Sequence, residues 1–139
     1  YIGTMTKSQN PLMFFESIYE LNLKEKKYQI DLIGNIHPDI KYYIEAKKYD
    51  NFIKTKPYIP HKDAIKKMCE SDFLLLVIPN TKKNKGIITG KLFEYIRSMR
   101  KIIMIGPPNS DAAKIIAQTN SGRCFDYSEK NKIKRIKFI

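Results

Sequence analysis

The chain has 139 residues, of which 42% are hydrophobic and 29% are charged. This length suits one domain with a sizeable core, and the composition excludes a disordered tail, a collagen-like repeat and a disulfide-rich miniprotein. No apolar run approaches the roughly 20 residues that a membrane span needs. The formal net charge is +12, but the basic residues are mostly lysines spread along the whole sequence. This spread indicates a compositional bias, and we expect no nucleic-acid partner.

The two ends of the sequence have the character of interrupted elements. Residues 1–4 match the end of a strand that enters a turn, and isoleucines recur at helical spacing up to Ile139. We therefore expect that the sequence is a domain cut from a longer protein. Cys69 and Cys124 fall in a predicted helix and a predicted strand, so we expect free thiols in a reducing compartment. This favours a cytoplasmic location.

Short apolar runs alternate with helical patterns along the chain, as is typical of a parallel sheet with crossover helices. Strands are expected at residues 1–4, 28–33, 51–55, 73–78, 101–105 and 123–127. Helices are expected at residues 11–27, 38–47, 61–69, 91–99 and 110–118, with Leu92, Phe93 and Ile96 facing the core in the fourth. Asn10 is the expected N-cap of the first helix, and Ser110 or Asp111 can cap the fifth. The sequence thus predicts an α/β fold, a Rossmann-like open parallel sheet of about six strands with helices on both faces.

Ligands of such sheets bind outside the carboxyl ends of the strands. The glycines and prolines of this chain gather in the loops that follow the predicted strands, at residues 3–4, 34–35, 57–58, 80–90 and 106–111. Glycine lets backbone N–H groups approach a ligand closely. Turns between strands and helices also need Gly and Pro without any ligand, so both explanations stay open.

The start of the fourth predicted helix is more informative. Gly86 and Gly90 precede it, and the N–H groups and positive dipole end of a helix start form a natural phosphate site. Glu94 lies one turn further on, where a carboxylate can accept hydrogen bonds from both hydroxyls of a ribose. The alternative is that Glu94 compensates the helix dipole and pairs with Arg97, three residues along the helix.

Residues 89–96 (TGKLFEYI), followed by a hydrophobic strand and by residues 106–113 (GPPNSDAA), resemble the C-terminal, nucleotide-sugar-binding domain of family 4-like glycosyltransferases with the GT-B fold. Gly3 after the first strand, Gly34 after the second and the loop 57–61 stand in the matching order. The resemblance implies a donor-binding domain at residues 1–127 and a truncated basic tail at residues 128–139. It also implies an N-terminal acceptor domain that is absent from this chain.

The resemblance also implies roles for single residues. The glutamate of this helix binds the donor ribose in the family, which assigns that role to Glu94, and Lys91 is a candidate for adding a charge at the diphosphate. Backbone contact with the diphosphate and donor sugar falls to Ile88, Thr89, Gly90 and Lys91; the first glycine turn contributes Gly3, Thr4 and the diphosphate-pairing Lys7; and Tyr58 lines the base pocket. A solvated surface role for Lys91 and packing of Tyr58 on its own loop are the alternatives.

The sequence also departs from the family pattern. Many members carry two glutamates eight positions apart, and the earlier position here is Gly86. We therefore assign no catalytic residue and no stereochemical outcome. His37 and His61 stand at helix starts and are expected to be structural. No residue set has metal-ligand spacing, and no nucleophile elbow or P-loop is present, so we expect no cofactor and metal-independent binding.

The resemblance implies the donor-binding half of a hexosyl-type glycosyltransferase in cell-surface polysaccharide or glycolipid synthesis. The expected partners are a nucleotide diphosphate sugar donor and an acceptor sugar or lipid-linked sugar held by the missing domain, and the fragment alone is expected to be inactive. Residues 130–139 combine lysines with helically spaced isoleucines, a pattern that fits either peripheral contact with the inner membrane face or a merely solvated end. The alternative is a non-catalytic doubly wound module that binds a nucleotide or a protein.

Overall fold

The computed structural model describes residues 1–25 and 27–129. Residues 130–139 of the basic tail, for which membrane contact and a solvated end are both open, lie outside the described residues. The chain forms two compact units. Unit 1 comprises Tyr1–Tyr58 and the described residues from Tyr127 on, and unit 2 comprises Ile59–Asp126.

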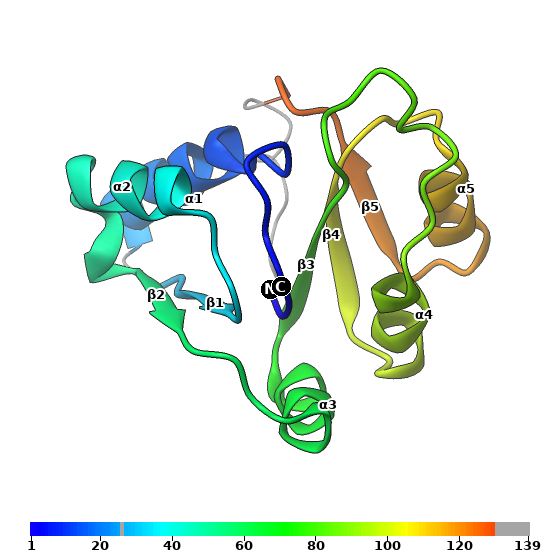
Figure 1. The fold of residues 1–139 in the computed structure, drawn as a ribbon, viewed down its shortest axis with the longest axis horizontal. Helices are drawn as coiled ribbons and strands as arrows, with labels where there is room; N and C mark the ends of the chain where they lie inside the picture. Colours follow the sequence, from blue (N-terminus) through cyan, green and yellow to red (C-terminus); the bar gives the residue numbers. More distant parts are fainter. Residues whose placement is uncertain (26, 130–139) are drawn as a thin grey trace. The chain divides into compact units, whose positions relative to one another are not determined.

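Unit 1 is built around a pair of parallel strands (Figure 1). Its elements in chain order are α1 (Leu12–Glu25), β1 (Ile30–Ile33), α2 (Pro38–Ala46), a 3-10 turn (Tyr49–Asn51) and β2 (Ile53–Lys56). The register pairs Ile30 with Ile53 and Ile33 with Lys56. As the sequence predicts, Asn10 begins α1: its Oδ1 accepts a hydrogen bond from the Leu12 N–H at 3.0 Å. Leu32 and Phe15 are fully buried in the core of this unit.

The first five residues run alongside β1 without forming a regular strand. They make two isolated parallel bridges, Ile2 with Ile33 and Met5 with Ile36. Between the bridges, Gly3 and Gly34 both have positive φ, 124° and 127°. A Cβ on Gly34 would lie 2.3 Å from the Gly3 carbonyl oxygen, so the two backbones approach each other here to a distance that only glycine permits. We call this close approach of Gly3 and Gly34 the crossing.

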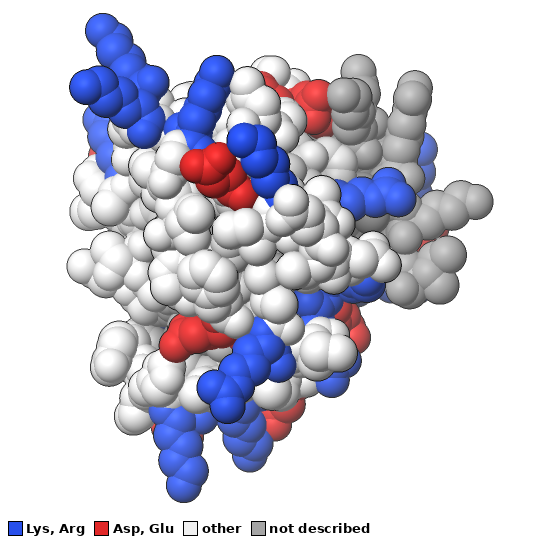
Figure 2. Space-filling view, turned by 90° about the vertical axis from the view of Figure 1, so that its right-hand side faces the viewer, with Lys and Arg blue, Asp and Glu red and all other residues white. Residues whose placement is uncertain are grey.

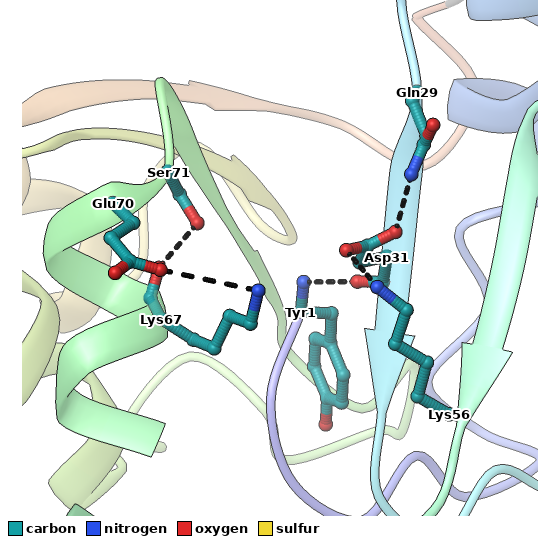
Figure 3. A network of polar contacts seen from close by, with 7 residues as sticks. All are labelled: Tyr1, Gln29, Asp31, Lys56, Lys67, Glu70 and Ser71. Carbon is teal, nitrogen blue, oxygen red and sulfur yellow. Dashed lines mark hydrogen bonds and ion pairs between the residues drawn. The ribbon is translucent and has the colours of Figure 1, made fainter. Parts of the chain in front are cut away.

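Polar groups near this crossing are paired (Figure 3). The Asp31 carboxylate accepts hydrogen bonds from Lys56 Nζ at 2.6 Å and from Gln29 Nε2 at 2.9 Å. The Tyr1 backbone nitrogen donates to the Asp31 carbonyl oxygen at 2.9 Å, and the Tyr1 hydroxyl donates to the Thr4 carbonyl oxygen at 2.6 Å. Burial raises the pKa of Tyr1 to about 12, which keeps its hydroxyl protonated as a donor.

Unit 2 contains a three-stranded parallel sheet in the order β3-β4-β5. Its elements are α3 (His61–Glu70), β3 (Phe73–Val77), α4 (Gly90–Arg97), β4 (Lys101–Ile105), α5 (Asp111–Gln118) and β5 (Gly122–Phe125). The side chains from Leu74 to Val77 and from Ile102 to Ile105 are buried. This burial explains the near-continuous apolar sequence of both strands. α4 and α5 pack along this sheet (Figure 1).

The end of α3 is stabilised by contacts within its last turn (Figure 3). The Ser71 hydroxyl donates to the Lys67 carbonyl oxygen at 2.7 Å, and Lys67 Nζ lies 4.0 Å from Glu70 Oε2. At the start of α5, Ser110 Oγ accepts the Ala113 N–H at 3.2 Å, which confirms the expectation that Ser110 can cap this helix.

The parallel α/β class is confirmed, whereas the single sheet of about six strands is wrong. The described residues form one sheet of two strands and one of three. The predicted first strand at residues 1–4 is reduced to isolated bridges, because the positive φ angles of Gly3 and Gly34 interrupt the ladder between them. The other five predicted strands are present and divide between the two units.

Candidate functional site

The loop from β3 to α4 is anchored at several points within unit 2. The Ile78 N–H donates to the Ile105 carbonyl oxygen at 2.9 Å, which continues the sheet by one residue. The buried Asn84 donates through Nδ2 to the Pro79 carbonyl oxygen at 3.0 Å, and the Asp111 N–H donates to the Lys85 carbonyl oxygen at 2.8 Å. These bonds tie the loop to the end of β3 and to the start of α5, and they set where α4 begins.

The polar groups at the start of α4 have fewer hydrogen-bond partners than those of the loop before it. Thr89 occupies the N-cap position without a side-chain capping bond. Among the residues that the structure describes, its buried Oγ1 has no hydrogen-bond partner. A Cβ on Gly90, the first helical residue, would have no atom of the described residues within 4 Å apart from its chain neighbours and the backbone of its own helix. Since the first N–H groups of a helix lack intrahelical acceptors, this backbone is open to an approaching anion.

The orientation of α4 differs from the expectation. Leu92 and Tyr95 are fully buried, while Phe93 is 55% exposed and Ile96 is half-buried. The prediction that Phe93 and Ile96 face the core with Leu92 is therefore wrong for Phe93. Tyr95 takes the buried place, because it lies three residues from Leu92 on the same helix face. Ile88, in the loop before the helix, is 43% exposed.

Lys91, in the first turn of α4, is half-buried. Burial lowers its pKa from the ordinary 10.5 to about 8, and the nearby Glu94 carboxylate offsets part of this effect. With a pKa near 8, Lys91 is close to losing its proton at neutral pH, and a bound anion would favour its protonated form. The alternative of a fully solvated surface lysine does not fit this burial.

Glu94 pairs with a residue of another helix. Its Oε1 lies 3.4 Å from Nε2 of His61, the first residue of α3, with 42% and 66% of the two side chains exposed. Within the described part of the chain, Glu94 makes no ion pair with Arg97, so the alternative of an i to i+3 pair is wrong. The expectation of a purely structural His61 needs revision, because Pro60 occupies the N-cap position and the imidazole points to Glu94. His37, by contrast, caps α2: its Nδ1 accepts the Asp39 N–H at 3.2 Å.

Four of the predicted site residues belong to unit 1. The Gly3 N–H donates to the Ile33 carbonyl oxygen at 2.8 Å, and the Thr4 carbonyl oxygen accepts the Tyr1 hydroxyl. Lys7 Nζ forms an ion pair with Asp39 Oδ2 at 2.9 Å, which lowers the pKa of Asp39. Tyr58 is 78% exposed and so is not packed on its own loop.

The other predicted residues, from Ile88 to Lys91 and Glu94, lie together in unit 2. Sequence reasoning did not include His61 in this group, because His61 and Glu94 are 33 positions apart and only the packing of two helices brings them together. The participation of the unit 1 residues in the same site stays a prediction.

Charge on the face drawn in Figure 2 is dispersed. Lys and Arg side chains stand at separate places, with Asp and Glu among them and uncharged surface between them. The described residues on this face form no continuous basic patch. Within residues 1–25 and 27–129, no cluster of three His, Cys, Asp or Glu residues is arranged to hold a metal ion. No helix in this part of the chain has both the length and the apolarity to span a membrane.

Comparison with known proteins shows a likeness of fold. The chain matches no protein-family model and no curated protein. It is similar to solved structures that include the pneumococcal O-GlcNAc transferase GtfA in complex with UDP and GlcNAc, with a TM-score of 0.68 and 15% sequence identity. The match covers 96% of this chain and 26% of that chain. The chain thus shares the fold of about a quarter of a glycosyltransferase.

Proposed function

We propose that the chain is the donor-binding part of a glycosyltransferase of the GT-B type, equivalent to the C-terminal domain of the family 4-like enzymes. The observation that carries this proposal is the unsatisfied start of α4 at Thr89 and Gly90, one turn before Glu94, in a fold that a glycosyltransferase shares. A nucleoside diphosphate sugar would place its diphosphate at this helix start and its ribose at Glu94.

The chemistry of the site suits a diphosphate leaving group. When the bond between sugar and diphosphate breaks, negative charge grows on the diphosphate oxygens. The α4 N–H groups and dipole, with a protonated Lys91, would stabilise that charge in place. The proposal includes metal-independent binding, because these groups supply the positive charge that a metal ion would otherwise bring.

The remaining parts of the proposal concern the rest of the enzyme. Lys7 would exchange its surface pair with Asp39 for the diphosphate, and the exposed Tyr58 would contact the base. The acceptor, a sugar or a lipid-linked sugar, would be held by another part of a longer protein, and the chain alone would transfer no hexose. This protein would act in the cytoplasm, at the inner membrane face, in polysaccharide or glycolipid synthesis.

Thermal denaturation with nucleotides tests the donor site. The full chain is heated with UDP, GDP, CDP or ADP, and a ligand at 100 times its dissociation constant adds about 2.7 kcal/mol to stability. We expect one diphosphate to raise the midpoint of the wild type and to lose most of this effect in Glu94→Ala. Glu70→Ala is the matched control, because Glu70 is a similarly exposed glutamate of unit 2 whose ion pairs, within the described part of the chain, are with lysines of α3.

Two outcomes would contradict the proposal. If no diphosphate moves the midpoint at millimolar concentration, the donor-binding function is wrong and the non-catalytic module becomes the better explanation. If Glu70→Ala loses the nucleotide effect as fully as Glu94→Ala does, the site is elsewhere in the chain.

A further inference from the structure

The His61–Glu94 pair joins two helices of unit 2. The α3 end is fixed by Pro60, whose carbonyl oxygen accepts the Ala64 N–H at 2.9 Å, and by the burial of Ala64 and Met68. The α4 end is fixed by the complete burial of Leu92 and Tyr95. Each side chain therefore extends from a helix whose position is set by the core, and Nε2 and Oε1 lie 3.4 Å apart.

The pair has little to do with holding the fold together. Both side chains are well exposed, and exposed ion pairs contribute little to stability. Glu94 is in the second turn of α4, and a glutamate side chain has three rotatable bonds, so an unheld carboxylate would occupy many orientations. His61 is the ion-pair partner of this carboxylate among the described residues. The pair therefore restricts the Glu94 side chain, which is the group that binds the ribose in the proposed function.

We propose that His61 is a positioning residue: its imidazole holds the Glu94 carboxylate in the orientation that accepts the two vicinal hydroxyls of a ribose. This inference rests on the proposed function and adds a residue to it. The imidazole Nε2 lies 3.4 Å from one carboxylate oxygen, and this contact restricts the orientation of the carboxylate before the ligand arrives. The ordering cost is then met on folding and not on binding.

The first measurement examines the pair without any nucleotide. The chain has only two histidines, so the ring signals of His61 and His37 can be assigned in a nitrogen-15 NMR spectrum with the His61→Gln variant. We expect Glu94→Gln to move the His61 ring signals and to leave those of His37 in place, because His37 lies in unit 1 and caps α2. Unmoved His61 signals would show that the pair does not form, and would overturn the inference.

The second measurement is the affinity of the full chain for UDP, GDP, CDP and ADP by calorimetry. For the diphosphate that binds, His61→Ala should weaken affinity about threefold to tenfold, the range for ordering one side chain. His61→Gln should restore most of it, since its amide N–H can donate to the same oxygen. In a Glu94→Ala background His61→Ala should have no further effect.

The outcomes separate this inference from the function on which it rests. If a diphosphate binds the wild type and His61→Ala binds it equally or more tightly, or loses as much affinity in the Glu94→Ala background, the positioning role is overturned while the donor site stands. If none of the four diphosphates binds the wild type, the proposed function fails, and the ribose role of the pair fails with it.

Discussion

Two regions of the molecule depend on glycine in opposite ways. At the crossing in unit 1, Gly3 and Gly34 let two backbone segments approach so closely that a Cβ on Gly34 would lie 2.3 Å from a carbonyl oxygen. At the start of α4 in unit 2, a Cβ on Gly90 would meet nothing within 4 Å. The first region has no room beside its glycine, and the second has room that the protein itself does not fill.

The polar groups of the two regions follow the same division. In unit 1 the Asp31 carboxylate has both Lys56 and Gln29 as hydrogen-bond donors. At the start of α4, among the residues that the structure describes, the buried Thr89 Oγ1 has no hydrogen-bond partner. Buried polar groups are normally paired, so an unpaired one at the α4 start fits the donor site that we propose there. The comparison thus sets a region whose polar groups are satisfied within the fold against one whose N-cap hydroxyl is not.

The largest effect on the free energy of unfolding should come from a substitution of Gly34, where the two backbone segments of unit 1 approach each other closely. Gly34→Ala adds a Cβ that overlaps the Gly3 carbonyl, at a φ of 127° that alanine rarely adopts. We expect a loss of about 3–5 kcal/mol from strain and overlap together. Urea denaturation of the variant and the wild type measures it. A loss below about 1 kcal/mol would show that the segments can separate easily, and would contradict the claim that Gly34, unlike Gly90, is required by the close approach of the backbones.

Lys91 should give the next largest effect, and its sign depends on pH. The folded pKa of about 8 is below the ordinary 10.5, so between these values the unfolded chain binds more protons and wild-type stability rises with pH. Below pH 8 the folded protein bears the full cost of a half-buried charge. Lys91→Met removes that cost, and we expect the variant to be more stable than the wild type by about 1–3 kcal/mol at pH 7.

The pH dependence provides the control for this experiment. The advantage of Lys91→Met should shrink as pH rises from 8 to 10.5, because the wild-type lysine becomes neutral in both states. The difference between the two unfolding free energies, measured at pH 7, 9 and 10.5, cancels the titration of all other groups. A difference that stays constant over this range would mean that Lys91 is not desolvated in the folded protein.

The N-cap residues of α4 and α5 should respond to substitution with opposite signs. Ser110→Ala removes the bond from the Ala113 N–H and should cost about 1 kcal/mol, as for other N-caps. Thr89→Val removes a hydroxyl that makes no bond within the described residues and should add about 1 kcal/mol. Chemical denaturation of both variants and of the wild type measures these changes in the free energy of unfolding. A loss of stability in Thr89→Val would place Thr89 with Ser110 as a structural cap.

Local chemistry explains which parts of the fold could be predicted from the sequence. The strand at Phe73–Val77 was recognisable because its apolar residues are continuous, and Ser110 because an N-cap acts within three residues. The rotation of α4 was not recognisable. Apolar or aromatic residues occupy positions 92, 93, 95 and 96, so periodicity alone does not select Leu92 and Tyr95 over Phe93.

The other misses have a common cause in contacts between distant residues. The break in the first strand depends on the meeting of Gly3 with Gly34, and the pairing of Glu94 depends on His61 in another helix. Propensity and spacing describe neighbours along the chain, and these pairs are more than 30 positions apart. The helix start at Gly90 and the place of Glu94 one turn further on could be predicted, but the partner of Glu94 could not.

Gly90→Ala should have the smallest effect on stability and completes the comparison with Gly34. Its Cβ would enter open space at the first helical position, where φ does not require glycine, so we expect a change within about 0.5 kcal/mol, slightly favourable because alanine is the better helix former. If the open backbone is where a diphosphate binds, the same methyl group should lower the affinity for the stabilising nucleotide about tenfold, because it occupies the space that a phosphate oxygen needs. Denaturation and calorimetry on one preparation measure both quantities. Unchanged stability with lost affinity would separate the roles of the two glycines, whereas unchanged affinity would mean that the open space at Gly90 is not the phosphate site.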